Sequence, residues 1–466
     1  MQKSRIATLI IAVMLLIVST APSLAQDEKP KPLNAPNALP GVEPEMLTPE
    51  YWIGLHDDAD DVIMTPRQIE RFNEKMRNNT LTTSSYEGGL TNPILPIVFH
   101  AQLPGDSLRV WFKKDMDELF TPEPLYGSSD FYDGRNVIYD DGMKRDLADK
   151  MNVDTVPDTV TRRFGIVINH SSVRHYPTHV PGYTNPTWEM DRFQLTDICL
   201  GHPVSILHES RDGDFLYVES SIALGWIAAR DIAIADRETV RGLTDDTNFL
   251  MAASDKVPVY GEPSFGSFAR YFYFSATLPL IESTGRGYVV KMPSRAPDGS
   301  LVIARGYIKP DADVHVGHIP YTKRNVLTQI FKLLNTPYGY NGQNNKRDCS
   351  GMLRVVLRCF GITTGRYIWS EPGNRTRIDP ELSTEEKLAK VAEIEPVITV
   401  AEGSYHFVLY LGKGHNGDLY FMHQGGWGYD VGDQHYNVNR VSINNVKHSW
   451  YHIDSPYFYW TVKPGK

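Results

Sequence analysis

The feature that most constrains the fold of this chain is a change in its hydrophobic pattern. From about residue 160 to 316, apolar and polar residues roughly alternate in short runs separated by turn residues, a pattern that predicts antiparallel strands. From Thr322 onward, apolar residues recur at helical spacing, and after about residue 400 the chain returns to short strands. Helices followed by antiparallel strands predict an α+β domain at residues 317–466, behind a β-rich region.

The first 25 residues predict a secretory signal peptide. Lys3 and Arg5 precede an apolar run from Ile6 to Val18, and small residues stand at the two positions that matter for cleavage, Ser23 and Ala25. Because no later stretch is apolar for 18 or more residues, we expect an exported protein with no stable membrane insertion after signal cleavage.

The segment between the signal and the β-rich region predicts two kinds of structure. Residues 26–50 hold six prolines among charged and small residues, which predicts a Pro-rich tether. Residues 51–155 predict a mostly helical segment. Thr65 can cap a helix that begins at Pro66, and residues 109–120 indicate a second helix.

Charge and cysteine content exclude some functions. The formal net charge of −9 gives no electrostatic footprint for nucleic acid or for an anionic membrane. Three cysteines are an odd number, so at least one thiol is free unless it pairs with another chain. Four histidines could suggest a metal, but no cysteine or carboxylate cluster at metal spacing accompanies them, so we expect surface or linker histidines and no metal or cofactor. They are His170, His175, His315 and His318.

Two of the cysteines lie in one predicted helix, over residues 347–362. Its apolar residues form a single stripe that includes Cys359, and Cys349 stands at the helix start. Ten residues of helix rise roughly 15 Å, whereas a disulfide needs Cα atoms within about 7 Å, so the two cannot pair. We expect Cys359 to be a core residue. Cys349 could also be mere packing, but a thiol at a helix N-terminus is favoured as a thiolate and suits a nucleophile.

A nucleophilic cysteine needs a base and a group that orients this base. His406 opens one predicted strand and His423 ends the next, with a glycine-rich hairpin loop between them. The imidazoles share a face only if paired residue numbers sum to an odd value, as when 406 pairs with 423. A slip by one residue would require a bulge to restore the arrangement. His415, in the loop, is a rival for His423.

The β-rich region resembles the bacterial SH3-like (SH3b) module, in which a glycine-tryptophan strand packs a small barrel. The matching residues are Gly225 and Trp226, and the resemblance implies a first SH3b-like barrel at residues 156–240. A weaker second copy, residues 241–316, has Tyr307 where the first has Trp226. One irregular β domain spanning both is the alternative.

The C-terminal domain resembles the NlpC/P60 family of papain-like cysteine peptidases. The resemblance rests on "PYGYNGQNNKRDCSG", followed by "YHFVLYLG" and "FMH". It implies a papain-like fold, with Cys349 as the nucleophile, His406 as its base and His423 as the residue that orients the base. The implied substrate-binding residues are Tyr338, Tyr340, Asp348 and Ser350. Asp348 could instead serve as a helix N-cap, a role that is compatible with touching substrate.

This sequence departs from the family pattern in three places. Tyr340 stands where tryptophan is usual, Asn341 replaces the first glycine, and Phe407-Val408 follows His406 where valine and glycine are common. The first two lie in the expected substrate groove and affect subsite preference more than catalysis.

The combined resemblance implies a periplasmic or secreted thiol protease acting on peptidoglycan stem peptides or muropeptides. The family's usual scissile bond joins γ-D-glutamate to a diamino acid, often meso-diaminopimelate, and is broken through a thioester acyl-enzyme. The SH3b-like modules would shape the substrate cleft, and Glu209, Tyr217 and Glu219 are candidates to bind a substrate amine by their chemistry alone. Two alternatives are an inactive wall-binding protein and an amidase or acyltransferase on the same fold.

Overall fold

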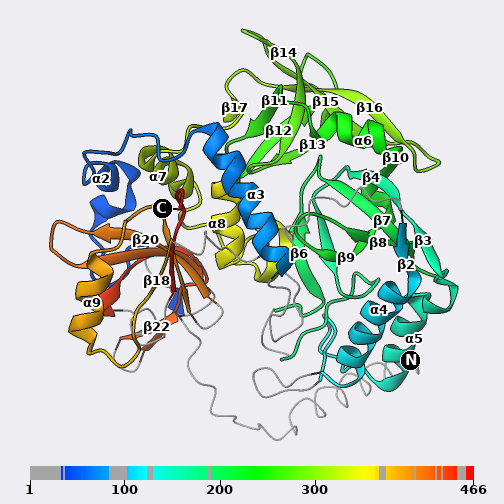
Figure 1. The fold of residues 1–466 in the computed structure, drawn as a ribbon, viewed down its shortest axis with the longest axis horizontal. Helices are drawn as coiled ribbons and strands as arrows, with labels where there is room; N and C mark the ends of the chain where they lie inside the picture. Colours follow the sequence, from blue (N-terminus) through cyan, green and yellow to red (C-terminus); the bar gives the residue numbers. More distant parts are fainter. Residues whose placement is uncertain are drawn as a thin grey trace, which may run out of the picture.

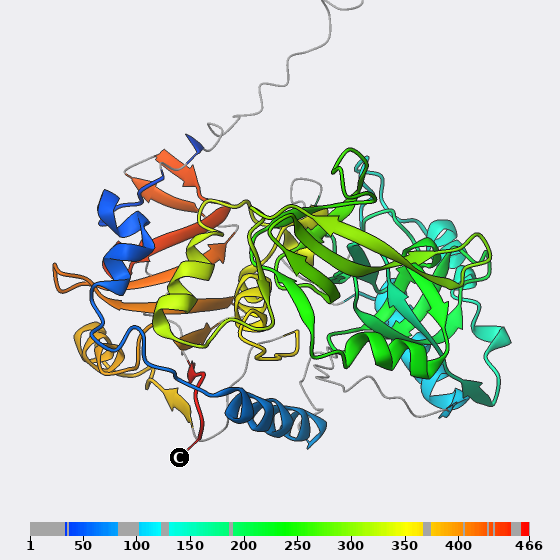
Figure 2. The same cartoon turned by 90° about the horizontal axis from the view of Figure 1, so that it is seen from above.

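The computed structural model describes residues 33–34, 37–82, 102–122, 130–185, 190–366, 374–403, 406–425, 428–431, 434–448 and 458–465. The predicted signal peptide and residues 26–32 and 35–36 of the predicted tether lie outside these ranges. Figures 1 and 2 show two β-rich modules, in green, on one side of the molecule and a third sheet, in orange and red, on the other. No helix among the described residues has both the length and the apolar character needed to cross a bilayer.

The first β module is an open seven-stranded sheet. Its order is β10 (Ile232–Ala235), β4 (Arg163–Val167), β7 (Pro203–Glu209), β8 (Phe215–Glu219), β9 (Leu224–Ala228), β5 (Ser171–Arg174) and β6 (Gln194–Ile198). Trp226 on β9 is fully buried, as the SH3b resemblance implies, and its ring stacks on Phe112 at 5.6 Å between centroids. Phe112 belongs to α4 (Gly105–Phe120), so α4 packs on this module beside α5 (Asp141–Lys150) (Figure 1).

The second β module is a separate seven-stranded sheet, which argues against one β domain spanning both regions. Its order is β13 (Phe268–Tyr273), β12 (Lys256–Tyr260), β16 (Leu301–Ile308), β15 (Gly287–Arg295), β14 (Thr277–Thr284), β11 (Phe249–Ala252) and β17 (Val314–Val316). Helix α6 (Arg237–Thr244) joins it to the first module. Neither sheet closes within the described residues, so the two small barrels expected from the sequence are not confirmed. Tyr307 is only half-buried and does not fill the place that Trp226 fills.

The C-terminal domain combines helices with an antiparallel sheet, as the hydrophobic pattern predicted. The sheet order is β18 (Arg375–Arg377), β25 (Phe458–Thr461), β19 (Thr399–Gly403), β20 (His406–Lys413), β21 (Leu419–Gly425) and β24 (Arg440–Asn445). Helices α7 (Lys323–Phe331) and α8 (Cys349–Arg358) pack on β19 to β21 in one apolar core, and α9 (Thr384–Ala392) belongs to a smaller core beside it.

Several short elements complete the chain. They are β1 (Leu33–Asn34), η1 (Pro44–Leu47), β2 (Gln102–Pro104), η2 (Val153–Thr155), β3 (Thr159–Thr161), η3 (Ala229–Asp231), η4 (Tyr340–Asn345), β22 (Gly428–Val431), β23 (Gln434–Asn437) and η6 (Val446–His448).

The N-terminal segment corrects one expectation. Residues 37–50 do not form a free tether, because Leu39 and Met46 are buried in the core of the C-terminal domain together with Trp52 of α2 (Pro49–Ile53). Two of the prolines in this stretch, Pro44 and Pro49, open η1 and α2, where a missing N–H costs nothing. In this segment, therefore, Pro44 and Pro49 mark the first residues of helices and not an unstructured chain.

The predicted helical segment divides between two bodies. Helix α3 (Pro66–Thr82) begins at Pro66, and Thr65 caps it by exchanging hydrogen bonds with Gln68. Its buried side chains, such as Phe72, join the core of the C-terminal domain, whereas α4 and α5 belong to the first β module. Residues 37–82 thus pack against the C-terminal domain, although both β modules separate the two in sequence (Figure 1).

Candidate active site

Helix α8 presents Cys349 at its first position, as predicted. Asp348 is the N-cap, and its Oδ1 accepts a hydrogen bond from the Gly351 amide at 2.7 Å. Gly361, with a left-handed φ of 80°, follows the helix end. Cys359 is fully buried, and its thiol donates to the Val355 carbonyl at 3.4 Å. All three cysteines are free, so the predicted absence of a Cys349–Cys359 disulfide is confirmed.

A β-bulge decides which face of the hairpin carries the two histidines. Near the turn, Lys413 pairs with Leu419, an even sum that would direct the two imidazoles to opposite faces. The register shifts between Tyr410 and Gly412, and beyond it Leu409 pairs with Met422, an odd sum. His406 and His423 therefore share a face and lie diagonal to each other rather than directly opposed.

The two imidazoles are hydrogen bonded. His406 Nε2 lies 2.8 Å from His423 Nδ1, with ring planes 85° apart. His406 is fully buried and His423 is 9% exposed. The rival His415 lies at the exposed end of the hairpin, where its ring contacts Tyr51 edge-on at 5.3 Å.

Asn444, on the neighbouring strand β24, extends this arrangement and was not foreseen from the sequence. Ser442 pairs directly with His423 across the sheet, so Asn444, two residues further on, faces the same side. The amide nitrogen of Asn444 donates to Ser442 Oγ at 3.0 Å, which leaves its carbonyl oxygen to accept from His423. In the sequence, the apolar residues Val441 and Ile443 alternate with the polar residues Ser442 and Asn444. This alternation is the signal that could have revealed a polar face on β24.

Electrostatics keep His423 neutral. Burial lowers the pKa of His423 to about 4, and the hydrogen bond with Asn444 opposes this only in part. A neutral His423 that donates to Asn444 must accept at Nδ1, so the proton in the His406–His423 hydrogen bond belongs to His406 Nε2. The lone pair of His406 is then at Nδ1, the form that a proton acceptor needs.

The Cys349 thiol does not ionise through its helix alone. Burial, followed by the charge of Asp348, raises the pKa of Cys349 to about 12, although the backbone amides of Phe407 and Ser350 and the charge of Arg366 act in the opposite direction. The expectation that the helix N-terminus favours a thiolate is therefore outweighed by desolvation. The contact with the Phe407 amide lies one residue from His406, so the thiol lies beside the strand that carries the candidate base.

Two of the residues predicted to bind substrate, Asp348 and Ser350, belong to a hydrogen-bond network around Arg366. The Arg366 guanidinium hydrogen bonds to Asp348, Ser350 and the side chain of Asn341. The Asp348 carboxylate also accepts hydrogen bonds from the Gly351 backbone amide, from the Ser350 hydroxyl at 3.2 Å and from the Asn341 backbone amide at 3.2 Å. Asp348 is thus the N-cap, as its position allowed, and its oxygens are engaged within the protein.

The two motif tyrosines lie in the loop before α8. Burial raises the pKa of Tyr338 far above its usual value, and the charges of Asp348 and Cys349 act in the same direction, so this hydroxyl stays protonated beside the thiol. Tyr338 and Tyr340 are both half-buried. Their contact with a substrate stays a prediction.

Strand β6 of the first β module docks on this motif loop. Asn341 Nδ2 donates to the Gln194 carbonyl at 2.6 Å, and the Asp191 amide donates to the Gln343 side chain at 3.0 Å. Asn341, one of the departures from the family pattern, therefore serves in a contact between domains. Glu209, Tyr217 and Glu219 are engaged elsewhere. Glu219 is buried with Arg162, Glu209 pairs with Arg163 at 3.2 Å, and Tyr217 is buried against Trp226.

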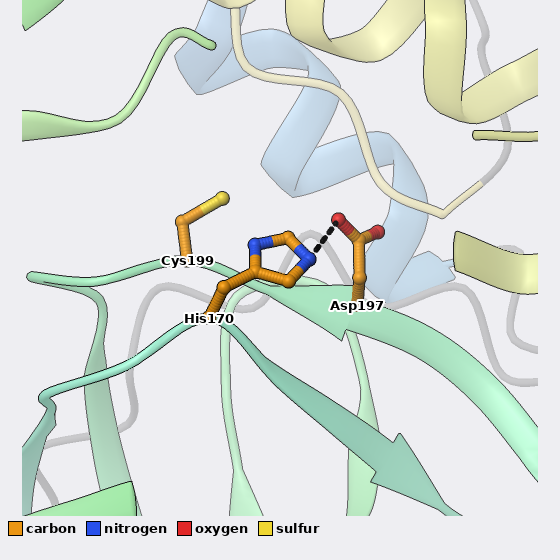
Figure 3. A group of neighbouring side chains, drawn as sticks. All are labelled: His170, Asp197 and Cys199. Carbon is orange, nitrogen blue, oxygen red and sulfur yellow. Dashed lines mark ion pairs between the residues drawn. The ribbon is translucent and has the colours of Figure 1, made fainter. Parts of the chain in front are cut away.

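A cluster of His170, Asp197 and Cys199 joins the first module to α8. The three residues bring one ligand atom each within 4.8 Å of the others, a spacing that could suit a metal ion. In Figure 3, however, the imidazole lies between the thiol and the carboxylate, with Nε2 at 3.3 Å from Asp197 Oδ2, so its two nitrogens face different partners. The other Asp197 oxygen pairs with Arg354 of α8 at 2.9 Å.

The carboxylate and the thiol around His170 favour its protonated form. Burial disfavours the imidazolium, but Cys199 and Asp197 together raise the pKa of His170 above its usual value. The side chain of His170 is 7% exposed, so the prediction of a surface or linker histidine is wrong at this position.

Comparisons with known proteins agree with this architecture. The family model of the SH3 domain of SH3b1 type matches residues 182–228, which include β6 to β9. An NlpC/P60 endopeptidase from Photobacterium damselae subsp. piscicida superposes with a TM-score of 0.70 at 16% identity, covering 93% of this chain and 100% of its own. An NlpC/P60 family protein from Bacillus cereus ATCC 10987 has 16% identity and a TM-score of 0.46, covering 65% of this chain and 100% of its own. Curated proteins gave no match.

The chain therefore has the fold of an NlpC/P60 endopeptidase and carries an SH3 domain of the SH3b1 type. This likeness in fold rests on the first of the two structures and confirms the resemblance that the Asp-Cys-Ser-Gly motif indicated.

Proposed function

We propose that this protein is a cysteine endopeptidase that hydrolyses the γ-D-glutamyl to meso-diaminopimelate bond of peptidoglycan stem peptides, outside the cytoplasm. The observation that carries the proposal is the 2.8 Å hydrogen bond between His406 and His423, on the strands that flank a cysteine at a helix N-terminus. A nucleophile, a base and a group that orients the base are the parts that thiol peptidases need.

In the acylation step, His406 Nδ1 takes the proton of the Cys349 thiol as sulfur attacks the carbonyl carbon of the γ-D-glutamyl group. Because the thiol is protonated at neutral pH, this transfer accompanies attack rather than preceding it. The C–N bond then breaks, His406 returns the proton to the amine of the diamino acid, and a thioester joins Cys349 to the substrate.

In the deacylation step, His406 removes a proton from water as the water oxygen attacks the thioester carbon. The C–S bond then breaks, the peptide leaves with a free γ-carboxyl group, and His406 returns the proton to the sulfur of Cys349. The negative oxygen of each tetrahedral intermediate lies near the N-terminus of α8, where backbone amides and the protonated Tyr338 hydroxyl can donate to it. His423 keeps His406 in the required tautomer throughout.

The first β module is proposed to form one wall of the substrate cleft. Its contacts with Asn341 and Gln343 support this, because they fix strand β6 against the loop that leads to Cys349. The buried pair of Arg366 and Asp348 neutralises the carboxylate beside the nucleophile, so a substrate group bound there meets little net charge.

The test is mass spectrometry of L-Ala-γ-D-Glu-meso-diaminopimelate, free and on purified sacculi, after incubation with wild-type protein, Cys349→Ala and His406→Ala. We expect wild type to release L-Ala-D-Glu and both variants to release none. His415→Ala, at the exposed end of the same hairpin, is the matched control and should cleave at the wild-type rate.

Each of the other outcomes of this experiment would indicate a different function for the protein. Binding to sacculi without cleavage by wild type would contradict the peptidase proposal and favour a wall-binding protein. Cleavage at another amide, or a product carrying a new acyl acceptor, would favour an amidase or an acyltransferase. Cleavage of the free peptide alone would indicate muropeptides as substrates.

A further inference from the structure

Two adjoining cavities lie where the two β modules meet the end of α8. Their volumes are about 190 and 220 Å³, and five lining residues are common to both: Leu243, Thr244, Thr277, Pro279 and Arg358. The walls come from α6, from β14 and, through Arg358, from the C-terminal end of the helix that begins with Cys349. Arg358 lies nine positions after Cys349, which separates the cavities from the thiol by about 14 Å along the helix.

Arg358 gives these cavities an uncompensated positive charge. Within the described part of the chain, its side chain has neither a carboxylate nor another hydrogen-bond partner. The carboxylate among the lining residues, Asp246, is paired with Lys291 at 3.3 Å and accepts from the Asn248 amide at 3.0 Å. The nearby Arg354 is already paired with Asp197. A half-buried guanidinium of this kind is stabilised by an anion.

Ser275 adds a buried donor to the second cavity. It is 1% exposed, and its hydroxyl has no hydrogen-bond partner among the described residues. Its backbone has a φ of 58°, in the left-handed region that serine rarely adopts. An unsatisfied buried hydroxyl and a strained backbone at the same residue are features that functional sites share.

The two histidines of the walls stay neutral, and the charges of Asp246 and Lys291 compensate each other. Burial lowers the pKa of His202 to about 3, and the charge of Arg358 acts in the same direction. Burial, followed by the charge of Arg358, also lowers the pKa of His318. Near neutral pH the free charge of the cavities is therefore that of Arg358 alone.

We propose that these cavities are a binding site for a small oxyanion, a carboxylate or a phosphate, held by the Arg358 guanidinium and the Ser275 hydroxyl. The planar guanidinium offers paired donors that match two oxygens of either anion, and Thr277 offers a further hydroxyl. This site is separate from the candidate active site and does not depend on the proposed peptidase activity. A bound anion would contact the second β module and α8 at once.

Isothermal titration calorimetry tests the site with the folded full chain. Inorganic phosphate and acetate are titrated in parallel at fixed ionic strength, with chloride as the balancing anion. Saturable binding of one or both is expected, and the stronger one identifies the anion class. Absence of saturable binding for both anions overturns the proposal.

Two variants and a control locate the binding. Arg358→Gln should weaken affinity at least about tenfold, since it removes a charged donor. Ser275→Gly removes the hydroxyl but tolerates the left-handed backbone, so it should weaken binding while the melting temperature without anion stays the same or rises. Arg305→Gln, on exposed β16, should bind like wild type. Affinities of both site variants within twofold of wild type would place any binding elsewhere and overturn the proposal.

Discussion

His406 Nε2 and His423 Nδ1 lie 2.8 Å apart, and a hydrogen bond between two neutral imidazoles contains a single proton. Because Asn444 accepts from the other side of His423, this proton resides on His406. The order of Asn444, His423 and His406 along the hydrogen-bonded chain thus determines the tautomer of His406, whose lone pair is at Nδ1.

The first prediction concerns Asn444. Asn444→Ala removes the acceptor and lets His423 adopt either tautomer, so kcat for stem-peptide cleavage should fall about tenfold with KM within about twofold. Asn444→Asp keeps an acceptor and adds a charge that raises the pKa of His423. It should retain most of kcat and move the acidic limb of the pH profile upward. Steady-state kinetics across pH 5 to 9 measure both effects.

Asn416→Ala is the matched control for Asn444, because Asn416 lies at the exposed turn of the same hairpin and donates to the Tyr420 hydroxyl. Its kinetics should equal those of wild type. A purely structural role for Asn444 would lower the melting temperature without moving the pH profile.

The second prediction is a loss of stability in acid caused by His423. Its pKa is about 4 in the folded protein against 6.5 when unfolded, so between these values the unfolded chain binds more protons. Stability from this group is complete above pH 6.5 and is lost as pH falls toward 4, by about 3 kcal/mol. Urea unfolding at pH 7.5 and 4.5 measures the decrease in the free energy of unfolding between the two pH values. In His423→Gln, this decrease should be smaller than in wild type by about 3 kcal/mol. In His415→Gln, the loss should equal that of wild type.

The third prediction concerns the pair that joins the first module to α8. Asp197→Asn leaves Arg354, only 3% exposed, without its counter-charge, and should lower the free energy of unfolding by about 3–5 kcal/mol. Asp60→Asn removes an equally well-formed but exposed partner of Arg324 and should have no measurable effect. Chemical denaturation compares the two, and equal effects would contradict the structural importance of Asp197.

The fourth prediction tests the bulge that aligns the histidines. Gly412 has a φ of 113°, and a Cβ there would lie 2.9 Å from Pro396 Cβ. Gly412→Ala should therefore destabilise the protein by about 1–2 kcal/mol or more. Gly242→Ala, in α6, meets no atom within 4 Å and should stabilise by roughly 0.5–1 kcal/mol. Thermal unfolding distinguishes the two changes by their sign.

The parts of the fold predicted from sequence were those with a local signal. The helical stripe and its N-cap located α7 and α8, Gly225-Trp226 located β9, and short strand-like runs located β20, β21, β24 and β25 of the C-terminal sheet. The prediction that paired residue numbers must have an odd sum was correct near His406 and His423. The bulge at Leu411 that produces this pairing was considered only as one possibility.

The parts that escaped prediction depend on partners far apart in the chain. Arg366 contacts Asp348 and Asn341, and Asn444 contacts His423, but no spacing rule links such positions. The thiolate expected at Cys349 failed for a similar reason. The helix N-terminus is visible in the sequence, whereas the burial that opposes ionisation exists only in the folded protein.

The position of residues 37–82 has a consequence for the order of folding. The core that surrounds α8 contains Leu39 and Trp52 from the start of the chain and Val462 from its end, with both β modules between them in sequence. Each β module can fold as soon as its own strands have been synthesised. The core behind Cys349 cannot be completed until Val462 has been synthesised, after both β modules. A variant that lacks residues 37–52 or Val462 should therefore keep folded β modules but lose the packing around α8.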